Sequence, residues 1–286
     1  MARMGSVARP ADSATGAADP GVPPLGSRLW LYTNFECNLA CDYCCAQSQP
    51  RPAAGARHLP VEVAARAGEE FAGLGGRELL LTGGEPFLHA DLAALVEAAG
   101  RYLSEPVVIL TNAMVFSRGH RYATLRALDP SRVVLQVSLD SGTPTLHDAH
   151  RGAGSFDKAR AGIELARSLG FRVKVAATID NTDAAEAVEF HALLDADGIP
   201  RADQLVRPVA RQGFADRGLV LTIDTLQPEP ALAVDGAWWH PVAITDPAMQ
   251  VASLPLPLVT VFAVVTATMN ARRADPNATL QAFRCT

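Results

Sequence analysis

Residues 29–45 read Leu-Trp-Leu-Tyr-Thr-Asn-Phe-Glu-Cys-Asn-Leu-Ala-Cys-Asp-Tyr-Cys-Cys, and this stretch decides the fold. Its first residues are mostly apolar, aromatic or β-branched, which is typical of a short buried strand. Cys37, Cys41 and Cys44 follow with C-x3-C-x2-C spacing, on the loop that would leave this strand. Three thiolates so close in sequence can converge on one small inorganic group. The stretch therefore predicts a metal centre at the carboxyl end of a strand.

Two kinds of metal centre use cysteines in this way. A structural zinc site is tetrahedral and usually needs a fourth protein ligand near by, which here would be Cys45 or a distant histidine. Adjacent side chains point in different directions in most backbones, however, so the use of both Cys44 and Cys45 is awkward. A [4Fe–4S] cluster held by only three cysteines instead leaves one iron open to bind another molecule.

Two further motifs follow the cysteines along the chain. Gly83-Gly84-Glu85-Pro86 comes directly after a predicted strand at residues 78–82, and Ser138-Leu139-Asp140 ends another at residues 132–139. An aromatic residue, Tyr43, directly precedes the third cysteine. Together these features, which span residues 29–211, resemble the signature of the radical S-adenosylmethionine (SAM) superfamily.

The resemblance implies that a [4Fe–4S] cluster on Cys37, Cys41 and Cys44 chelates the amino and carboxylate groups of SAM. One electron would then break SAM into methionine and a 5′-deoxyadenosyl radical, so no acid–base residues of the chain are required, and none is identified. The SAM-binding residues that the resemblance implies are Tyr43, Gly83, Gly84, Glu85, Asn112, Ser138, Asp140 and Arg151.

The chemistry of these residues suits the implied roles. The two glycines let the backbone approach a ligand closely, and a backbone carbonyl or the Glu85 side chain would accept from the methionine ammonium group. The other expected contacts are Ser138 to the methionine carboxylate, Asn112 and Asp140 to the ribose, Arg151 to a carboxylate and Tyr43 to the adenine. Each of these residues could instead have a purely structural role: a side chain that caps a turn, a solvated charge or, for Tyr43, a ring packed in the core.

Composition narrows the class of protein. The 286 residues are 49% hydrophobic and 19% charged, which fits a globular protein with one substantial core. A net charge of −5 argues against a nucleic-acid partner. Four of the five cysteines lie within residues 37–45, which is unlike a disulfide framework and indicates a reducing, cytoplasmic setting. Residues 1–28 contain no apolar segment long enough for a signal peptide.

The rest of the chain predicts an α/β protein with a partial (β/α)6 TIM-like barrel. Six apolar strands alternate with helices, which requires parallel strands covered on their outer side. We expect a flexible tail at residues 1–27, the barrel at 28–212 and a short C-terminal hairpin and helix extension at 213–286. The expected strands are 29–34, 78–82, 107–111, 132–139, 171–178 and 204–209; the expected helices are 61–74, 91–103, 121–128, 156–169 and 184–194.

The strand at residues 132–139 shows how the barrel is lined. Its apolar residues share one face, and Gln136, Ser138 and Asp140 share the other, which we expect to point into the lumen. By the same alternation Lys174 and Arg207 face the lumen from later strands, and Arg211 follows just beyond. These cations are candidates for a substrate anion or for the SAM carboxylate.

The C-terminal extension offers weaker patterns. We expect a strand at residues 219–223 and a hairpin at 231–244, with Asp235-Gly236 as its turn. Residues 251–269 carry no charge, and we interpret them as packed on the barrel because two prolines interrupt a membrane span. The extension is similar to the SPASM and twitch extensions of the family but lacks cysteines for an auxiliary cluster. Cys45 and Cys285 are left over, as lumen thiols or as buried inert ones.

The sequence therefore predicts a cytoplasmic radical SAM enzyme that modifies a small metabolite or a peptide. The resemblance also implies an electron donor such as a flavodoxin or ferredoxin, and we expect no nucleic-acid or membrane partner. One alternative is a non-catalytic iron–sulfur or zinc protein that senses redox state or scaffolds a partner. Another is a family member that transfers a group from SAM.

Overall fold

The computed structural model describes residues 26–179 and 184–274 together with residues 283 and 285. The tail expected at residues 1–27 lies almost entirely outside the described residues. The described strands are β1 (Arg28–Tyr32), β2 (Glu78–Thr82), β3 (Val107–Thr111), β4 (Val133–Ser138), β5 (Arg172–Ile179), β6 (Gln204–Pro208), β7 (Ala231–Ala233), β8 (Gly236–Trp238) and β9 (Gln250–Ala252). The described α-helices are α1 (Val61–Gly73), α2 (Leu92–Gly100), α3 (Gly119–Ala127), α4 (Pro144–Arg151), α5 (Ser155–Ser168), α6 (Ala184–Ala196) and α7 (Leu258–Arg273).

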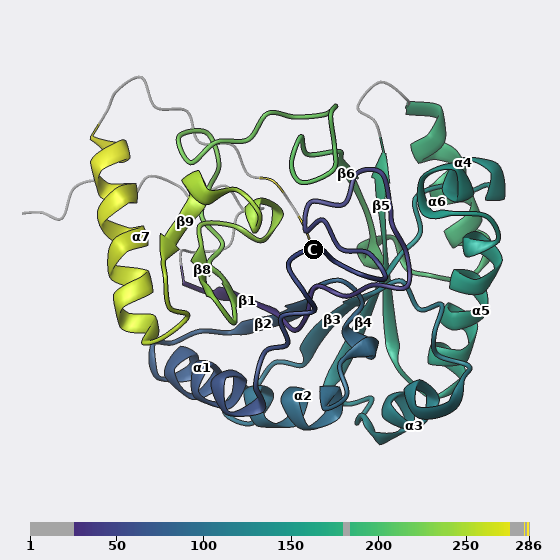
Figure 1. The fold of residues 1–286 in the computed structure, drawn as a ribbon. Helices are drawn as coiled ribbons and strands as arrows, with labels where there is room; N and C mark the ends of the chain where they lie inside the picture. The colour runs from purple at the N-terminus through teal and green to yellow at the C-terminus, as the bar shows by residue number, and fades with distance from the viewer. Residues whose placement is uncertain (1–25, 180–183, 275–282, 284, 286) are drawn as a thin grey trace, which may run out of the picture.

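The described strands form one curved sheet in the order β6-β5-β4-β3-β2-β1-β7-β8-β9. Strands β1 to β6 are all parallel, in register pairs such as Trp30 with Leu80 and Val137 with Val175. Helices α1 to α6 lie on the outer side of this curve, as Figure 1 shows. The predicted α/β alternation and partial barrel are confirmed. Because the strands are parallel, their carboxyl ends and the loops that follow gather at one rim.

Strand β4 shows how the two faces of the sheet differ. Val133, Leu135 and Val137 belong to the core between the sheet and the outer helices. Gln136 and Ser138 alternate with them and face the lumen, as predicted. Each fully buried leucine or valine contributes about 1.5–3 kcal/mol to folding, so this alternation fixes which side chains reach the lumen.

The C-terminal extension continues the sheet beyond β1. Strand β7 pairs in parallel with β1, and β8 and β9 follow antiparallel. The hairpin is shorter than predicted, and its two-residue turn, Val234-Asp235, comes one residue early. The strand predicted at residues 219–223 is wrong: in the described structure this segment makes only an isolated bridge, between Leu219 and Ala210.

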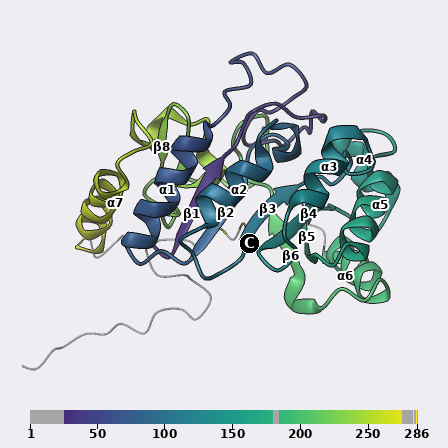
Figure 2. The same cartoon turned by 90° about the horizontal axis from the view of Figure 1, so that it is seen from below.

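Helix α7 covers the outer side of the extension. Its first backbone N–H, at Leu258, donates to Glu70 Oε2 of α1 at 2.6 Å, and Phe262 meets Phe71 with ring centroids 6.4 Å apart. In Figure 2 the two helices lie on the same side of the sheet. No helix within the described ranges is both long and apolar enough to cross a membrane. Helix α4 and strand β9 had no sequence prediction.

Candidate functional site

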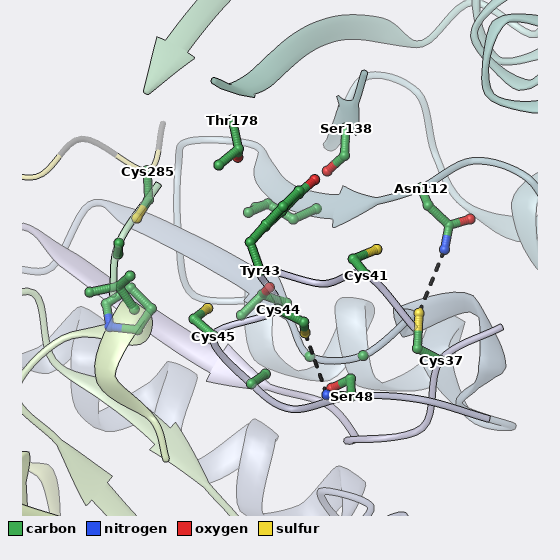
Figure 3. A pocket seen from close by; sticks show the side chains of 18 of the residues that line it. Cys37, Cys41, Tyr43, Cys44, Cys45, Ser48, Asn112, Ser138, Thr178 and Cys285 are labelled. Atoms are coloured by element: carbon green, nitrogen blue, oxygen red, sulfur yellow. Dashed lines mark hydrogen bonds between the residues drawn. The ribbon is translucent and has the colours of Figure 1, made fainter. Parts of the chain in front are cut away.

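A pocket opens in the lumen at the carboxyl ends of the strands (Figure 3). The space between its lining residues is about 1030 Å³, which includes the open solvent at its mouth. All five cysteines of the chain line it. The other lining residues that bear on its chemistry are Tyr32, Tyr43, Ser48, Gly83, Gly84, Asn112, Ser138, Arg151, Thr178, Arg207 and Phe283.

The cysteine loop is fixed by backbone contacts from distant parts of the chain. The Cys37 N–H donates to the Gln49 carbonyl at 3.2 Å, which closes the loop on itself. The Phe214 N–H donates to the Cys44 carbonyl at 3.1 Å, and the Thr245 hydroxyl donates to the Cys45 carbonyl at 2.9 Å. The C-terminal extension therefore helps to hold the cysteines in place.

Gly213 permits this close approach. Its φ of +63° lies in the left-handed region, and a Cβ built on it would fall 2.3 Å from the Cys44 carbonyl oxygen. Any larger residue would push the extension away from the cysteine loop, because only glycine combines this backbone conformation with so short a contact.

The thiols of Cys37, Cys41 and Cys44 face the pocket from different directions (Figure 3). Within the part of the chain that the structure describes, no three His, Cys, Asp or Glu side chains lie close enough together to hold one metal ion. Zinc–sulfur bonds of about 2.3 Å would need the thiols in mutual contact, whereas a cubane bonds each cysteine to a different iron.

Two further observations bear on the fit of such a group. Burial raises the pKa of Cys41 and of Cys44 to about 11 each, so a bound metal would have to displace their protons. The Ser48 hydroxyl is buried and, among the described residues, has no hydrogen-bond partner. It lines the pocket next to Cys44, whose Sγ accepts from the Ser48 N–H at 3.4 Å. A sulfur-rich group in the pocket would supply the missing acceptor.

The Gly83-Gly84-Glu85-Pro86 loop lies directly under the cysteine loop. Its Gly84 and Glu85 N–H groups donate to the Asn34 and Glu36 carbonyls at 3.0 and 2.8 Å. A Cβ on Gly84 would meet the Glu36 carbonyl oxygen at 2.1 Å. The glycines therefore serve the contact between the two loops, and they also line the pocket.

The Glu85 side chain points away from the pocket. Glu85 is fully buried, and its carboxylate accepts from Thr111 Oγ1 at 2.7 Å, the Asn112 N–H at 2.8 Å and the Phe87 N–H at 3.1 Å. Its carbonyl accepts from Asn34 Nδ2 at 3.0 Å. Burial raises the pKa of Glu85 to about 7, against the effect of these donors. The residue joins the loop to the end of β3 instead of reaching the pocket.

Asn112 lies at the end of β3, where its side chain faces the first cysteine. Its Nδ2 donates to Asn38 Oδ1 at 2.9 Å and lies 3.8 Å from Cys37 Sγ (Figure 3). The residue lines the pocket as predicted, but its closest described partners belong to the cysteine loop.

Asp140, Arg151 and Tyr43 form a wall between this pocket and a second one. Arg151 donates to both oxygens of Asp140, with Nε to Oδ2 at 2.6 Å and Nη2 to Oδ1 at 3.1 Å, and the Tyr43 hydroxyl donates to the same carboxylate. Burial opposes ionisation of Asp140, but the Arg151 cation outweighs it and holds the pKa of Asp140 below its usual range. Tyr43 and Arg151 line the main pocket.

Asp140, for which a ribose contact was expected, lies apart from the main pocket. Its carboxylate is engaged by Arg151, Tyr43 and the Thr178 N–H, and the residue lines the second pocket instead of the main one. Strand β4 ends at Ser138, so the alternation that puts Ser138 in the main pocket no longer governs Asp140.

His147 supports this wall from α4 and predicts a dependence of stability on pH. Its Nδ1 accepts from the Asp140 N–H at 3.1 Å, and burial together with the Arg151 cation lowers the pKa of His147 to about 4 from 6.5. The unfolded chain therefore binds more protons between pH 6.5 and 4, so the free energy of unfolding falls as the pH falls through this window. We expect the titration of His147 to lower the free energy of unfolding by about 2 kcal/mol between pH 7 and pH 5.

Urea unfolding at pH 7 and pH 5 checks this expectation. The loss of stability should be about 2 kcal/mol smaller in His147→Asn than in the unsubstituted chain. Other titrating groups are present in both proteins, so they cancel in the difference. Equal losses in the two proteins would contradict the assignment.

The three predicted substrate cations have different positions. Arg207 on β6 lines the pocket and donates from Nε to Thr178 Oγ1 at 3.1 Å. Lys174 shares the inner face of β5 but pairs in register with Gln136, below the rim, and does not line the pocket. Arg211 is exposed and also lies outside the pocket. Of the three cations, Arg207 is thus the one that lines the pocket.

Sequence reasoning missed several residues of the pocket. Thr178 lines the pocket but had no predicted role, and Gln136, which strand phase placed in the lumen, had none either. No sequence pattern indicated that Ser48 and Phe283 line the pocket. Their positions result from contacts between segments that are far apart in the chain. Cys45 and Cys285 were recognised only as leftover thiols, and both line the pocket.

Comparison with known proteins gives a match to one protein family. Residues 32–192, more than half of the chain, match the family model described as "Radical SAM superfamily". A GTP 3′,8-cyclase of Caulobacter vibrioides is 35% identical over 146 residues, covering 49% of this chain and 40% of the relative. An AdoMet-dependent heme synthase of Oleidesulfovibrio alaskensis is 30% identical over 166 residues, covering 57% and 41%. The matches thus span about two fifths of the length of these relatives.

Solved structures with little sequence similarity share the fold. The structure of anSMEcpe with bound AdoMet has a TM-score of 0.65 at 13% identity and covers 84% of this chain and 82% of that one. A structure of anSMEcpe with AdoMet and the Cp18Cys peptide has a TM-score of 0.50 at 16% identity, covering 64% and 50%. At this identity the likeness extends to the architecture alone.

Proposed function

Because this chain belongs to the radical SAM superfamily, we propose that it holds a [4Fe–4S] cluster on Cys37, Cys41 and Cys44 and reductively cleaves SAM. The observation that carries the proposal is the pocket, in which the three thiols and the Gly83-Gly84 backbone face one space. Ligation by these three thiols would leave one iron of the cluster open. The unpaired Ser48 hydroxyl beside Cys44 supports the same fit.

When bound, the cluster and SAM supply one electron and a 5′-deoxyadenosyl radical, so the chain provides binding and orientation. The backbone of Gly83 and Gly84 would hold the methionine amino group, and Ser138 would donate to the carboxylate. Arg151 is already paired with Asp140, so its charge is compensated and its main contribution is the wall it forms with Tyr43.

The substrate is proposed to be a peptide or a small metabolite. One solved structure of the same fold holds a peptide together with AdoMet, and the curated relatives carry the names of a GTP cyclase and a heme synthase. An electron donor such as a flavodoxin or ferredoxin would reduce the cluster. Two arginines line the described part of the pocket, and Arg151 is neutralised by Asp140. Arg207 has no such carboxylate partner there, which favours a substrate with a carbonyl, carboxylate or phosphate.

Anaerobic reconstitution with iron and sulfide, followed by addition of dithionite and SAM, tests the proposed function. Chromatography should show methionine and 5′-deoxyadenosine formed in equal amounts. A redox sensor would bind iron but form neither product, and a group-transfer enzyme would leave a different fragment of SAM. Either result would overturn the proposal.

Ser48→Ala tests whether the unpaired hydroxyl serves the cluster. In the protein without iron, the free energy of unfolding should change little, because no described hydrogen bond is lost. In the loaded protein the reduction potential should fall by roughly 20–60 mV, the equivalent of one hydrogen bond to the cluster sulfurs. Redox titration followed by electron paramagnetic resonance measures the potential. Ser141→Ala, in the second pocket, is the matched control, and equal potentials in all three proteins would exclude this role.

A further inference from the structure

Helix α3 begins with positive charge that no described carboxylate neutralises. Arg118 is at the N-cap position and Arg121 lies in the first turn, and both residues are exposed. Neither forms an ion pair with the described residues, whereas Arg160 on α5 and Arg172 on β5 each pair with an aspartate. Residues 106–128 contain no Asp or Glu, although the whole chain has a net charge of −5. Arg118 and Arg121 therefore form a local positive surface, which we call the α3 basic surface.

This charge does not stabilise the helix on which it lies. The amino-terminal end of a helix carries a partial positive charge, so acidic side chains are favourable there and cations are not. The first turn of α3 contains no acidic residue, and the Arg118 side chain makes no capping hydrogen bond. Two cations three residues apart also repel each other. The α3 basic surface therefore opposes local stability, which is expected of residues that serve a function instead of the fold.

The α3 basic surface lies at the rim of the barrel, beside the cysteine loop. Helix α3 follows the carboxyl end of β3 after a short loop, so its first residues are at the rim. Asn112 Nδ2 lies 3.8 Å from Cys37 Sγ, and Asn112 Oδ1 accepts from the Met114 N–H at 3.0 Å (Figure 3 shows the first of these contacts). Met114 is half-buried, and its Sδ lies 4.0 Å from Asn38 Nδ2. A short series of contacts thus leads from the first cysteine sulfur to the surface, four residues before Arg118.

The position of this surface indicates what kind of partner it fits. The rate of electron transfer falls steeply with distance, so a protein that reduces a cluster on Cys37, Cys41 and Cys44 must approach the cysteine loop closely. SAM and the substrate would occupy the pocket, which leaves the outer side of the loop for the reductant. A positive surface at that place attracts a protein with a negative surface and speeds the encounter.

We propose that the α3 basic surface binds an acidic protein that carries single electrons. The inference rests on the proposed function and names the surface at which the electron enters. One electron passes from the reduced group of the partner to the cluster, so the partner is oxidised by one electron, the cluster is reduced by one, and no bond forms or breaks. The two arginines act by attraction and orientation at the edge of the contact.

Nucleic acid is the other polyanion that a positive surface could bind. His120, between the two arginines in the sequence, has its Nε2 3.3 Å from the Ala90 carbonyl, and the next residue is the exposed Asp91. A carboxylate beside the arginines suits a protein partner, which presents separate charges of both signs. It suits a phosphate backbone less well, because that backbone presents only negative charge.

Binding is measured with the iron-free chain and an acidic bacterial flavodoxin that carries a fluorophore. Fluorescence anisotropy at low ionic strength should show saturable binding, which weakens as salt is added because salt screens the attraction. Arg121→Glu should weaken binding at least about threefold, and Arg118→Glu/Arg121→Glu at least about tenfold. Both substitutions place an acid at the start of the helix, where it favours folding, so lost binding would not result from an unfolded helix.

Arg77→Glu is the matched control for these variants. Arg77 is also exposed and has no ion pair among the described residues, but it directly precedes β2, at the opposite end of the barrel from the rim. This variant should bind flavodoxin as the unsubstituted chain does. The proposal would be overturned by no saturable binding to the unsubstituted chain, by equal binding to all four proteins, or by tighter binding of a fluorescent RNA duplex than of flavodoxin.

Electron delivery is measured with the reconstituted chain under anaerobic conditions. Reduced flavodoxin should reduce the cluster at least about tenfold more slowly in Arg118→Glu/Arg121→Glu, as followed by visible absorbance. Reduced methyl viologen is a small carrier that needs no docking surface, so its reaction should not be slowed. An equal loss of rate with both reductants would mean that the substitutions disturb the cluster itself, and it would overturn the proposal.

The binding measurement needs neither iron nor SAM. A failure to bind flavodoxin leaves SAM cleavage with dithionite untouched, and a failure of SAM cleavage leaves the binding measurable. The two proposals can therefore be rejected separately.

Discussion

Cys37→Ala, Cys41→Ala and Cys44→Ala are each expected to reduce SAM cleavage more than about 100-fold. Loss of a residue that only supports a metal ligand costs 10- to 100-fold, and loss of a ligand itself should cost more. Iron bound after anaerobic reconstitution should fall in parallel, because each cysteine would hold a different iron of the cluster. Iron analysis and the yield of 5′-deoxyadenosine measure the two effects on the same preparations.

Cys45→Ala is the matched control for these variants. Cys45 also lines the pocket, and its backbone carbonyl, which accepts from Thr245, is kept in the variant. We expect its iron content to match that of the unsubstituted chain. A zinc site that used Cys45 as its fourth ligand would instead lose metal in all four variants. That outcome would contradict the cluster and favour the zinc alternative.

Arg151→Met is expected to lower the free energy of unfolding by about 3–5 kcal/mol, the largest effect on stability that we predict. The Arg151 and Asp140 side chains are only 8% and 3% exposed, so the substitution leaves a buried carboxylate without its cation. Tyr43 and the Thr178 N–H still donate to Asp140, but they do not neutralise its charge. Urea unfolding at pH 7, without iron or SAM, measures the effect.

Two further variants define the cause of this loss. Arg201→Met removes an ion pair to Asp195 in which the side chains are 60% and 44% exposed, and it should cost less than about 1 kcal/mol. The double variant Arg151→Met/Asp140→Leu removes both buried charges and should lose less stability than Arg151→Met alone. A double variant less stable than the single one would mean that packing, not the unpaired charge, explains the loss.

The fold could be predicted from sequence wherever a residue pattern is compatible with only one kind of secondary structure. The four apolar residues at 107–110, followed by the β-branched Thr111, predict β3 to the residue. The alternation at 133–138 correctly places Gln136 and Ser138 in the lumen. Residues 219–223 show the opposite case. They are apolar and β-branched like a strand. Apart from one bridge, however, no described strand pairs with them, because contacts within the C-terminal extension determine their conformation.

The site was harder to predict than the fold, and Glu85 shows why. A motif can indicate that a loop is important without indicating which of its atoms meets the ligand. The Glu85 carboxylate is taken by three donors of the chain itself, a fact that depends on where β3 ends relative to the loop. Lys174 shows a second limit. Strand phase gave the correct face but not the depth along the strand, and depth decides which residues reach the pocket.

Electron paramagnetic resonance of the anaerobically reconstituted, dithionite-reduced chain tests the cluster most directly. We predict about four irons per chain and a reduced-cluster spectrum that changes when SAM is added, because one iron is left open by the three cysteines. A chain that binds no iron would contradict the proposed cluster. A fully loaded chain whose spectrum is the same with and without SAM would contradict it as well.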